Sequence, residues 1–452
     1  MIFTPIRLLL SRVAARRLPA LNTLAVFVAI GLLAVPFTGI LPGTNARAAG
    51  SGEMPAEDLP IGKATDVGMS AERLQRIADV MTRAIDTKQI SGAVTLVARH
   101  GQIAHFEAHG LRNIEAGYAM ETDTIFPIAS MTKPVSGVAI LMLVEEGTVR
   151  LSDPVSRFIP EFHDTHVAIA KPTSGDDDAE IYTVPADREI TVRDLLTHTS
   201  GLGSGGVGSR EVSRIAPRRS TDTLETYTTD LGAAPLDFQP GTEWAYSGLA
   251  GIDTVGRIVE VVSGLTFDEF LRVRIFEPLS MEDTGFVVPD HKASRVVTLY
   301  GRTPAGLERR DVPGWVDTAT LFSGGGGLWS TAGDYVKFAQ MLVNRGELDG
   351  VRLLGSKTVE LMASNHVGDL YATAARTGGR PGKGFGLTVD VVLDAVAAQD
   401  NRSTGSFGWS GAFGTTFWVD WEEEMTAILM VQTPGGPLRA DFQNAVRQAI
   451  VD

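Results

Sequence analysis

The chain has 452 residues, a formal net charge of −14, 44% hydrophobic residues and no cysteine. Without cysteine it can form no thiol nucleophile, thiolate metal site, iron–sulfur cluster or disulfide. The negative charge argues against binding to nucleic acid and against charge-driven binding to anionic membranes. The length accommodates one large domain or two of ordinary size.

Residues 1–48 have the composition of an export signal. Four arginines precede an uncharged stretch, residues 18–46, and Ala46-Arg47-Ala48 supplies the small residues of a cleavage site. The uncharged stretch is also long enough to span a bilayer, which takes about 20 residues, so an uncleaved membrane anchor is the alternative. Pro36 and the cleavage site favour removal. We therefore expect an exported protein, periplasmic or secreted, in which a linker over residues 49–68 precedes the folded part.

From residue 69 onward the pattern predicts a globular chain that begins with a helix and two strands. Residues 70–88 repeat apolar side chains at helical spacing, with Ser70 as the N-cap. Residues 92–99 and 102–108 are strand-like runs on either side of His100-Gly101, which indicates a hairpin.

The eight histidines suggest no metal site. His105 and His109 lie in the second strand-like run, and His163 and His166 lie in a loop. We expect these side chains to be structural or solvated, because a zinc site needs a third ligand and a clearer helical frame. No metal and no cofactor is therefore expected.

The middle of the chain, about residues 130–320, is predicted to be mostly helical with long loops. Helices are expected over residues 130–144, 191–201, 249–262 and 266–275. The loop that ends near residue 190 contains Gly175-Asp-Asp-Asp178, which we expect to be a solvated acidic patch. The glycine-rich run at 201–208 lacks the following Gly-Lys-Ser/Thr of a phosphate-binding loop.

The C-terminal part returns to a mixed pattern. Strands are predicted over residues 385–392, 415–420 and 425–432, and helices over 331–344, 356–364 and 437–451. Sheet-forming stretches thus lie at both ends of the chain. We expect one α/β layer domain, built from about residues 69–129 and 321–452, with an all-α domain inserted between its halves.

The stretch around Ser130 carries the first catalytic candidates. Lys133 follows Ser130 by three residues, so the two side chains share one face if a helix begins here. A serine hydroxyl needs an adjacent base to act as a nucleophile. A lysine can be that base where burial or a neighbouring cation lowers its pKa, and the apolar run that follows can supply burial.

Two further stretches suit a Ser/Lys hydrolase. Tyr246 follows the turn Gln239-Pro-Gly241 at the mouth of a helix, where its phenol could take or pass on the serine proton. Residues 408–414 (GWSGAFG) are glycine-rich and precede a strand, so their backbone N–H groups could face an oxyanion. The alternatives are a half-buried core tyrosine and an ordinary glycine-broken strand.

With these motifs in order, the chain resembles the serine β-lactamase-like superfamily, and within it the family VIII carboxylesterases and class C β-lactamases. The matching stretches span nearly the whole chain after the export segment: residues 130–133 (SMTK), 195–202 (LLTHTSGL), 241–246 (GTEWAY), 324–331 (GGGGLWST) and 409–414 (WSGAFG). The resemblance implies a β-lactamase/transpeptidase-like fold, with an antiparallel sheet flanked by helices and a helical domain, in agreement with the α/β (α+β) layout above.

The resemblance also implies roles for individual residues. Ser130 matches the acylated nucleophile, Lys133 its partner base, and Tyr246 the tyrosine of the family's Tyr-x-Asn element. Trp409-Ser410-Gly411 takes the place of the Lys-Thr-Gly strand and would bind substrate. The backbone N–H groups of Ser130 and Ala412 would form the oxyanion hole.

This sequence departs from the family pattern at two polar anchors. Tyr246-Ser247-Gly248 lacks the asparagine, and Trp409 replaces the lysine that suits a β-lactam carboxylate. Arg376-Thr-Gly378 imitates Lys-Thr-Gly better, but it lies in a Gly/Pro-rich loop without a strand. A Gly-x-Ser-x-Gly elbow, the mark of an α/β-hydrolase, is absent from the sequence.

We therefore expect a serine hydrolase that cleaves small or short-chain carboxylic esters through an acyl-enzyme on Ser130. The alternatives are a β-lactamase or D-Ala-D-Ala carboxypeptidase, a transacylase, and a non-catalytic binding protein of the same fold. The expected partner is a small ester, without nucleic acid, and with a membrane only if residues 18–46 remain as an anchor.

Overall fold

The computed structural model describes residues 56–452 except 172–179, 315, 317–319, 375–378 and 434. The predicted export segment, the acidic patch at 175–178 and Arg376-Thr-Gly378 lie outside the described residues. The described residues form one compact unit. None of the helices in the described ranges has both the length and the apolar character needed to cross a bilayer.

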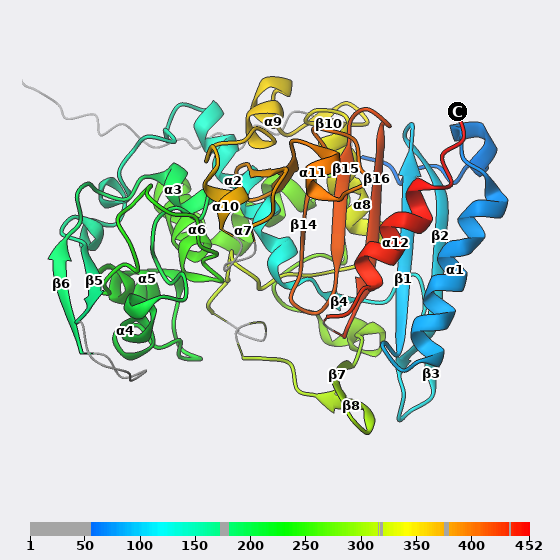
Figure 1. The fold of residues 1–452 in the computed structure, drawn as a ribbon, viewed down its shortest axis with the longest axis horizontal. Coiled ribbons are helices and arrows are strands. Elements are labelled where there is room, and N and C mark those ends of the chain that lie inside the picture. The colour runs from blue at the N-terminus through cyan, green and yellow to red at the C-terminus, as the bar shows by residue number, and fades with distance from the viewer. Residues whose placement is uncertain (1–55, 172–179, 315, 317–319, 375–378, 434) are drawn as a thin grey trace, which may run out of the picture. The chain divides into compact units, whose positions relative to one another are not determined.

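An eight-stranded antiparallel sheet is the centre of the fold, in the order β12-β13-β14-β15-β16-β1-β2-β3 (Figure 1). Its strands are β1 (Gly92–Arg99), β2 (Gln102–Asn113), β3 (Tyr118–Ala119), β12 (Lys383–Phe385), β13 (Asp390–Val392), β14 (Phe407–Ser410), β15 (Thr416–Asp420) and β16 (Met425–Val431). Strand β1 pairs with β16 from Ala93↔Val431 to Arg99↔Met425. The two ends of the chain therefore build one sheet, and the predicted fold class is confirmed.

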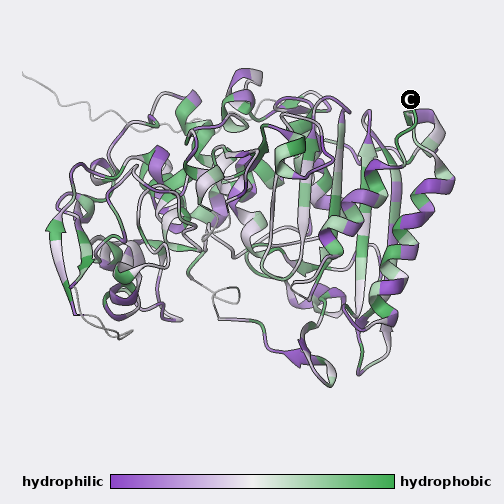
Figure 2. Ribbon diagram, viewed as in Figure 1, coloured by the Kyte–Doolittle hydropathy of each residue, from purple (hydrophilic) through white to green (hydrophobic). Residues whose placement is uncertain are grey.

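Helices cover both faces of the sheet, and β1 and β16 are therefore buried along their whole lengths. One face packs against α1 (Ala71–Asp86) and α12 (Leu438–Arg447). The other packs against α8 (Ala332–Val343), and the buried residues of α2 (Thr132–Glu145) belong to the same core cluster as those of α8. The outer helices α1 and α12 alternate polar and apolar bands in Figure 2, as a helix with one buried face should. Helix α2 is buried from Thr132 to Leu143.

The stretch between the two sheet-forming parts is mainly helical, as predicted. Its helices are α3 (Val192–Leu196), α4 (Val207–Ile215), α5 (Leu224–Gly232), α6 (Ala250–Ser263) and α7 (Phe267–Leu271). It also contains two hairpins, β5 (His166–Ala170) with β6 (Ile181–Pro185), and β7 (Leu299–Thr303) with β8 (Gly306–Arg310). The all-α expectation missed them, because β6 and β8 have no buried residue and show no clear alternation.

Short elements complete the fold. They are β4 (Phe126–Pro127) paired with β9 (Trp329–Ser330), β10 (Glu347–Leu348) paired with β11 (Val351–Arg352), and the helices α9 (Ser356–Met362), α10 (Leu370–Thr373) and α11 (Ala395–Ala398). The pair β4–β9 fixes the entry to α2: Ile128 N–H donates to the Leu328 carbonyl over 3.0 Å. The hydroxyl of the fully buried Tyr335, on α8, donates to the Met131 carbonyl over 2.9 Å. The start of α2 is thus anchored from two sides.

Candidate active site

Ser130 lies in a single 3-10 turn, Ala129–Met131, directly before α2. Its hydroxyl accepts hydrogen bonds from the Tyr246 hydroxyl over 2.7 Å and from Lys133 Nζ over 3.3 Å. The preceding residue, Ala129, has a φ of +47° and is fully buried. A side chain in this left-handed region costs free energy that the surrounding packing must offset. The structure thus brings together the three predicted catalytic residues around one strained turn.

Lys133 is fully buried beneath Ser130. Besides Ser130 it donates to two backbone carbonyls, those of Gly248 over 2.5 Å and Gly325 over 2.6 Å. Its nitrogen also lies 4.9 Å from the centre of the Tyr246 ring. Within the described residues no carboxylate lies in salt-bridge range of this nitrogen. The position of the ammonium group is therefore set by backbone carbonyls.

The Gly325 carbonyl is itself held in place by Asp253 on α6. One oxygen of the fully buried Asp253 accepts from Gly325 N–H over 3.0 Å and from the Ser323 hydroxyl over 2.7 Å, and the other pairs with Arg218. A Cβ on Gly325 would lie 2.7 Å from the Cα of Leu249, so only glycine fits here. The four-glycine run therefore lets the loop approach α6 closely enough to present its carbonyl to the lysine.

Tyr246 is held by aromatic side chains. Its ring centre lies 4.7 Å from that of His198 and 5.6 Å from that of Trp409. His198 is fully buried, and its Nδ1 accepts from the Ser247 N–H over 3.3 Å. Burial, reinforced by the charge of Lys133, lowers the pKa of His198 well below its usual value. Its imidazole is therefore neutral and positions the Tyr246 segment without adding a second positive charge.

The end of β14 forms the opposite wall. Trp409 packs edge-on against Phe385 at 5.3 Å, and the Ser410 hydroxyl shares a 2.8 Å hydrogen bond with that of Thr416. A Cβ on Gly411 would lie 2.3 Å from the Ile128 carbonyl oxygen, so glycine brings this strand against the turn that carries Ser130. Ala412, the next residue, is exposed. Among the described residues its N–H has no hydrogen-bond acceptor.

One cleft of about 620 Å³ collects the predicted residues. Its walls include Ser130, Tyr246, Trp409, Ser410, Gly411 and Ala412, with Lys133 buried below. This accounts for every site residue predicted from the sequence.

The far wall of the cleft is charged but internally paired. Lys383 lies 2.7 Å from Asp390 and 3.2 Å from Asp400, and Arg402 lies 2.7 Å from Asp400. Burial raises the pKa of Asp400, but its hydrogen bond to Arg402 and the two nearby cations hold it below its usual range. Two acids thus offset Lys383 and Arg402, but Arg380 and Arg439 also line the cleft, so its lining carries more positive than negative charge.

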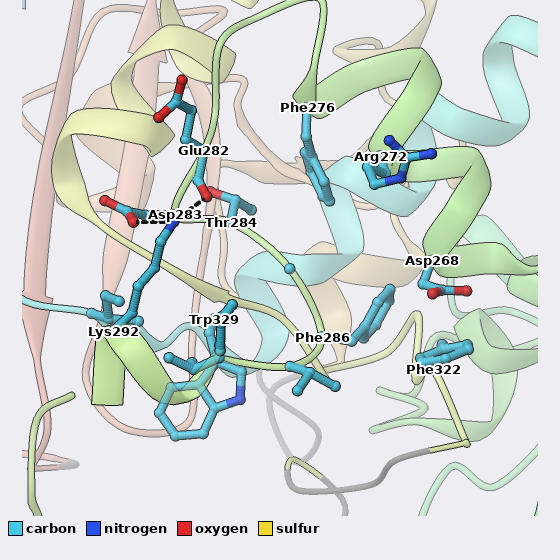
Figure 3. Close-up of a pocket in the computed structure, with 15 residues that line it drawn as sticks. Asp268, Arg272, Phe276, Glu282, Asp283, Thr284, Phe286, Lys292, Phe322 and Trp329 are labelled. Atoms are coloured by element: carbon cyan, nitrogen blue, oxygen red, sulfur yellow. Dashed lines mark hydrogen bonds and ion pairs between the residues drawn. The ribbon is translucent and has the colours of Figure 1, made fainter. Parts of the chain in front are cut away.

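A second cavity, of about 260 Å³, lies elsewhere in the fold (Figure 3). Aromatic side chains of Phe276, Phe286, Phe322 and Trp329 surround it, and none of the predicted site residues lines it. At its edge Lys292 pairs with Asp283 over 2.8 Å. This cavity offers no nucleophile–base pair comparable to Ser130 and Lys133.

Sequence reasoning missed the residues that support the site. The sequence predicts only a helix around Asp253. An acidic residue on the apolar face of residues 250–259 is nevertheless a signal of a functional or structural role, because acids are seldom buried without a partner. His198 was noted only within a matching stretch. The charged wall of the cleft is formed by residues of β12, β13 and the following loop, and no local sequence pattern predicts it.

Comparisons with known proteins agree with this geometry. The structure of EstCE1, a hydrolase with promiscuous acyltransferase activity, superposes with a TM-score of 0.71 at 27% identity, over 83% of this chain and 99% of that one. Esterase EstB of Burkholderia gladioli is 31% identical over 86% of this chain and 97% of its own. Protein Rv1367c of Mycobacterium tuberculosis is 36% identical over 77% of this chain and 87% of its own.

These similarities identify this protein as a serine hydrolase, and they are consistent with a serine ester hydrolase. The Beta-lactamase family model matches residues 77–451, and the chain belongs to that family. The predicted family is thereby confirmed.

Replacing Asp253 by asparagine should lower the free energy of unfolding by about 3–5 kcal/mol, because Arg218 loses its buried partner. It should also lower kcat, because the Gly325 carbonyl beneath Lys133 loses its anchor. Urea unfolding and ester hydrolysis measure the two effects. Asp230→Asn, which breaks the partly exposed pair with Arg219, is the control and should cost less than about 1 kcal/mol. Equal effects of the two substitutions would contradict the role given to Asp253.

His198 predicts a pH dependence of stability. In the unfolded chain this histidine takes up a proton near pH 6.5, but the buried ring does not, so its contribution is complete above that pH and is lost as the pH falls. Below about pH 6.5 the wild type should lose up to about 1.4 kcal/mol per pH unit more than His198→Gln. His163→Gln should change the pH dependence of the free energy of unfolding in the opposite sense, because the hydrogen bond to Glu189 raises the pKa of this exposed histidine. Unfolding curves for His198→Gln that parallel the wild type between pH 5 and 8 would refute this assignment.

Proposed function

We propose that the protein cleaves small, neutral carboxylic esters through an acyl-enzyme on Ser130. The observation that carries the proposal is the hydrogen-bonded cluster in which the Ser130 hydroxyl lies between the Tyr246 hydroxyl and the Lys133 nitrogen. A nucleophile held between two groups that can exchange protons is the arrangement that covalent ester hydrolysis requires.

In the reactive state the Tyr246–Lys133 pair holds one proton fewer than a phenol plus an ammonium group, so it can take the Ser130 proton while Oγ attacks the ester carbonyl. The N–H groups of Ser130 and Ala412 stabilise the oxyanion of the tetrahedral intermediate. The intermediate collapses to the acyl-enzyme, and the same pair returns the proton to the departing alcohol oxygen. Because the two groups act as one coupled acid–base unit, the proton belongs to the pair.

In deacylation, water takes the place of the alcohol. The Tyr246–Lys133 pair accepts a proton from the water as its oxygen attacks the acyl carbon. The second tetrahedral intermediate uses the same N–H groups, and its collapse returns the proton to Ser130 Oγ and releases the carboxylic acid. No metal or cofactor takes part in either half-reaction.

The walls of the cleft support a neutral, partly apolar acyl group. Trp409 presents an indole where a lysine would suit a β-lactam carboxylate, and the charges of Lys383, Asp390, Asp400 and Arg402 are engaged with one another. The relative EstB is named as an esterase, which supports an ester as the substrate of this protein. The EstCE1 likeness supports a second capacity, transfer of the acyl group to an alcohol in place of water.

Export stays a prediction from the sequence. We propose that residues 1–48 direct the chain across the cytoplasmic membrane and are then removed. The arginine-rich start, the uncharged stretch and the small-residue cleavage site support this.

Comparing wild type with Ser130→Ala on p-nitrophenyl butyrate and on a chromogenic cephalosporin tests the proposal. We expect ester cleavage to fall by at least about 10³-fold in the variant, and the wild type to turn over the cephalosporin more slowly than the ester. A control variant, Ser263→Ala, removes a hydroxyl at the end of α6 that donates to the Val259 carbonyl, and it should keep most of the activity.

Other outcomes select the alternatives. Faster cephalosporin turnover would favour a β-lactamase, and a new ester formed with added alcohol would show acyl transfer. Ester cleavage that survives Ser130→Ala would overturn the mechanism.

A further inference from the structure

Strand β2 carries three potential metal ligands on one face. Alternate residues of a strand point to the same side, so His105, Glu107 and His109 share a face. Their partners on β1 are Val97, Thr95 and Ala93. Val97 and Ala93 belong to the core cluster of α1 and α12, which places the three ligands on that face of the sheet, whereas α2 belongs to the core cluster on the other face.

The three side chains lie close to one another. His105 Nδ1 is 3.8 Å from one oxygen of Glu107, and His109 Nε2 is 3.9 Å from the other. One ligand atom from each residue lies within 4.8 Å of the others. Four ligands at 2.0–2.1 Å around Zn²⁺ would lie roughly 3.3 Å apart. The Glu107 side chain is 45% exposed, so rotating it can shorten its distances to the two histidines without moving the strand.

Thr95 gives His105 the supporting contact that metal sites use, whereas on His109 it contacts the nitrogen that faces Glu107. The Thr95 hydroxyl oxygen lies 2.7 Å from His105 Nε2 and 3.1 Å from His109 Nε2. If His105 Nε2–H donates to this hydroxyl, the Nδ1 lone pair faces the Glu107 carboxylate. A cation between these two acceptors removes their repulsion, and a hydrogen bond on the other ring nitrogen is the usual way to orient a ligating histidine.

Both imidazoles of this cluster are affected by burial. Burial, with a contribution from His109, lowers the pKa of His105 to about 4. Burial also lowers the pKa of His109. Neutral imidazole is the form that binds metal ions. His105 is buried, whereas the partly exposed Glu107 leaves access from solvent.

We propose that His105, Glu107 and His109 form a binding site for one divalent transition-metal ion such as Zn²⁺, with water completing its coordination. Two imidazoles and a carboxylate are ligands that suit Zn²⁺. The sequence alone predicts no metal site at His105 and His109, because a third ligand and a helical frame are missing. In the structure, the spacing along β2 places Glu107 between the two histidines. A metal ion here would tie together three residues of β2 near the edge of the sheet and stabilise the fold.

Titration calorimetry of the EDTA-treated, dialysed protein with Zn²⁺ alone tests the site. We expect one ion per chain, and at least about tenfold weaker binding in Glu107→Gln and His109→Ala, because even supporting residues of metal sites are worth 10–100-fold. His163→Ala is the matched control, since His163 also lies beside a carboxylate, Glu189, and it should bind like the wild type. The two test variants alter partly exposed side chains, which avoids the buried His105.

Two further readouts separate this site from the catalytic one. At one Zn²⁺ concentration, the melting temperature of the wild type should rise by more than that of Glu107→Gln, because weaker binding stabilises less. Removal of metal by EDTA should not lower the rate of ester cleavage, because Ser130 lies on the other side of the sheet. Absence of stoichiometric binding, or binding in Glu107→Gln and His109→Ala as tight as in the wild type, would overturn the proposal.

Discussion

The site depends on a buried ammonium group whose acceptors are backbone carbonyls. Lys133 donates to Gly248 and Gly325 and to the Ser130 hydroxyl, and it has no exposed surface. Burying such a group is costly unless each of its donors is satisfied. The long loops of the inserted stretch, the close approach of the four glycines and the anchor at Asp253 together meet that requirement. They also fix the nitrogen within reach of Ser130.

The sheet contributes the other half of the site. Because β14 belongs to the same antiparallel sheet as β1, the C-terminal part of the chain brings Gly411 against the Ile128 carbonyl and Ala412 beside Ser130. A local motif thus becomes a cleft only through long-range strand pairing. The indole of Trp409 gives one wall of this cleft an apolar surface, and Lys383, Asp390, Asp400 and Arg402 pair with one another on the far wall.

Much of this arrangement could be predicted because it is encoded by local spacing or by motif order. The Ser130/Lys133 spacing, the strands at both ends and the glycine-rich stretch at 408–414 each have a direct physical meaning. The hairpin of β5 and β6 was missed because exposed strands lack a clear period. Asp253, His198 and Glu107 were missed because their importance arises from partners far along the chain or across a strand pair, which no local pattern contains.

The central claim is that the acyl group of the ester is carried by Ser130. Its most direct test is to quench the reaction with p-nitrophenyl butyrate in acid during turnover and to locate the acyl group by peptide mass spectrometry. The account predicts a butyryl group on the peptide that contains Ser130, and on Ser130 itself after fragmentation. An acyl group on another residue of a protein that is cleaving the ester would contradict it.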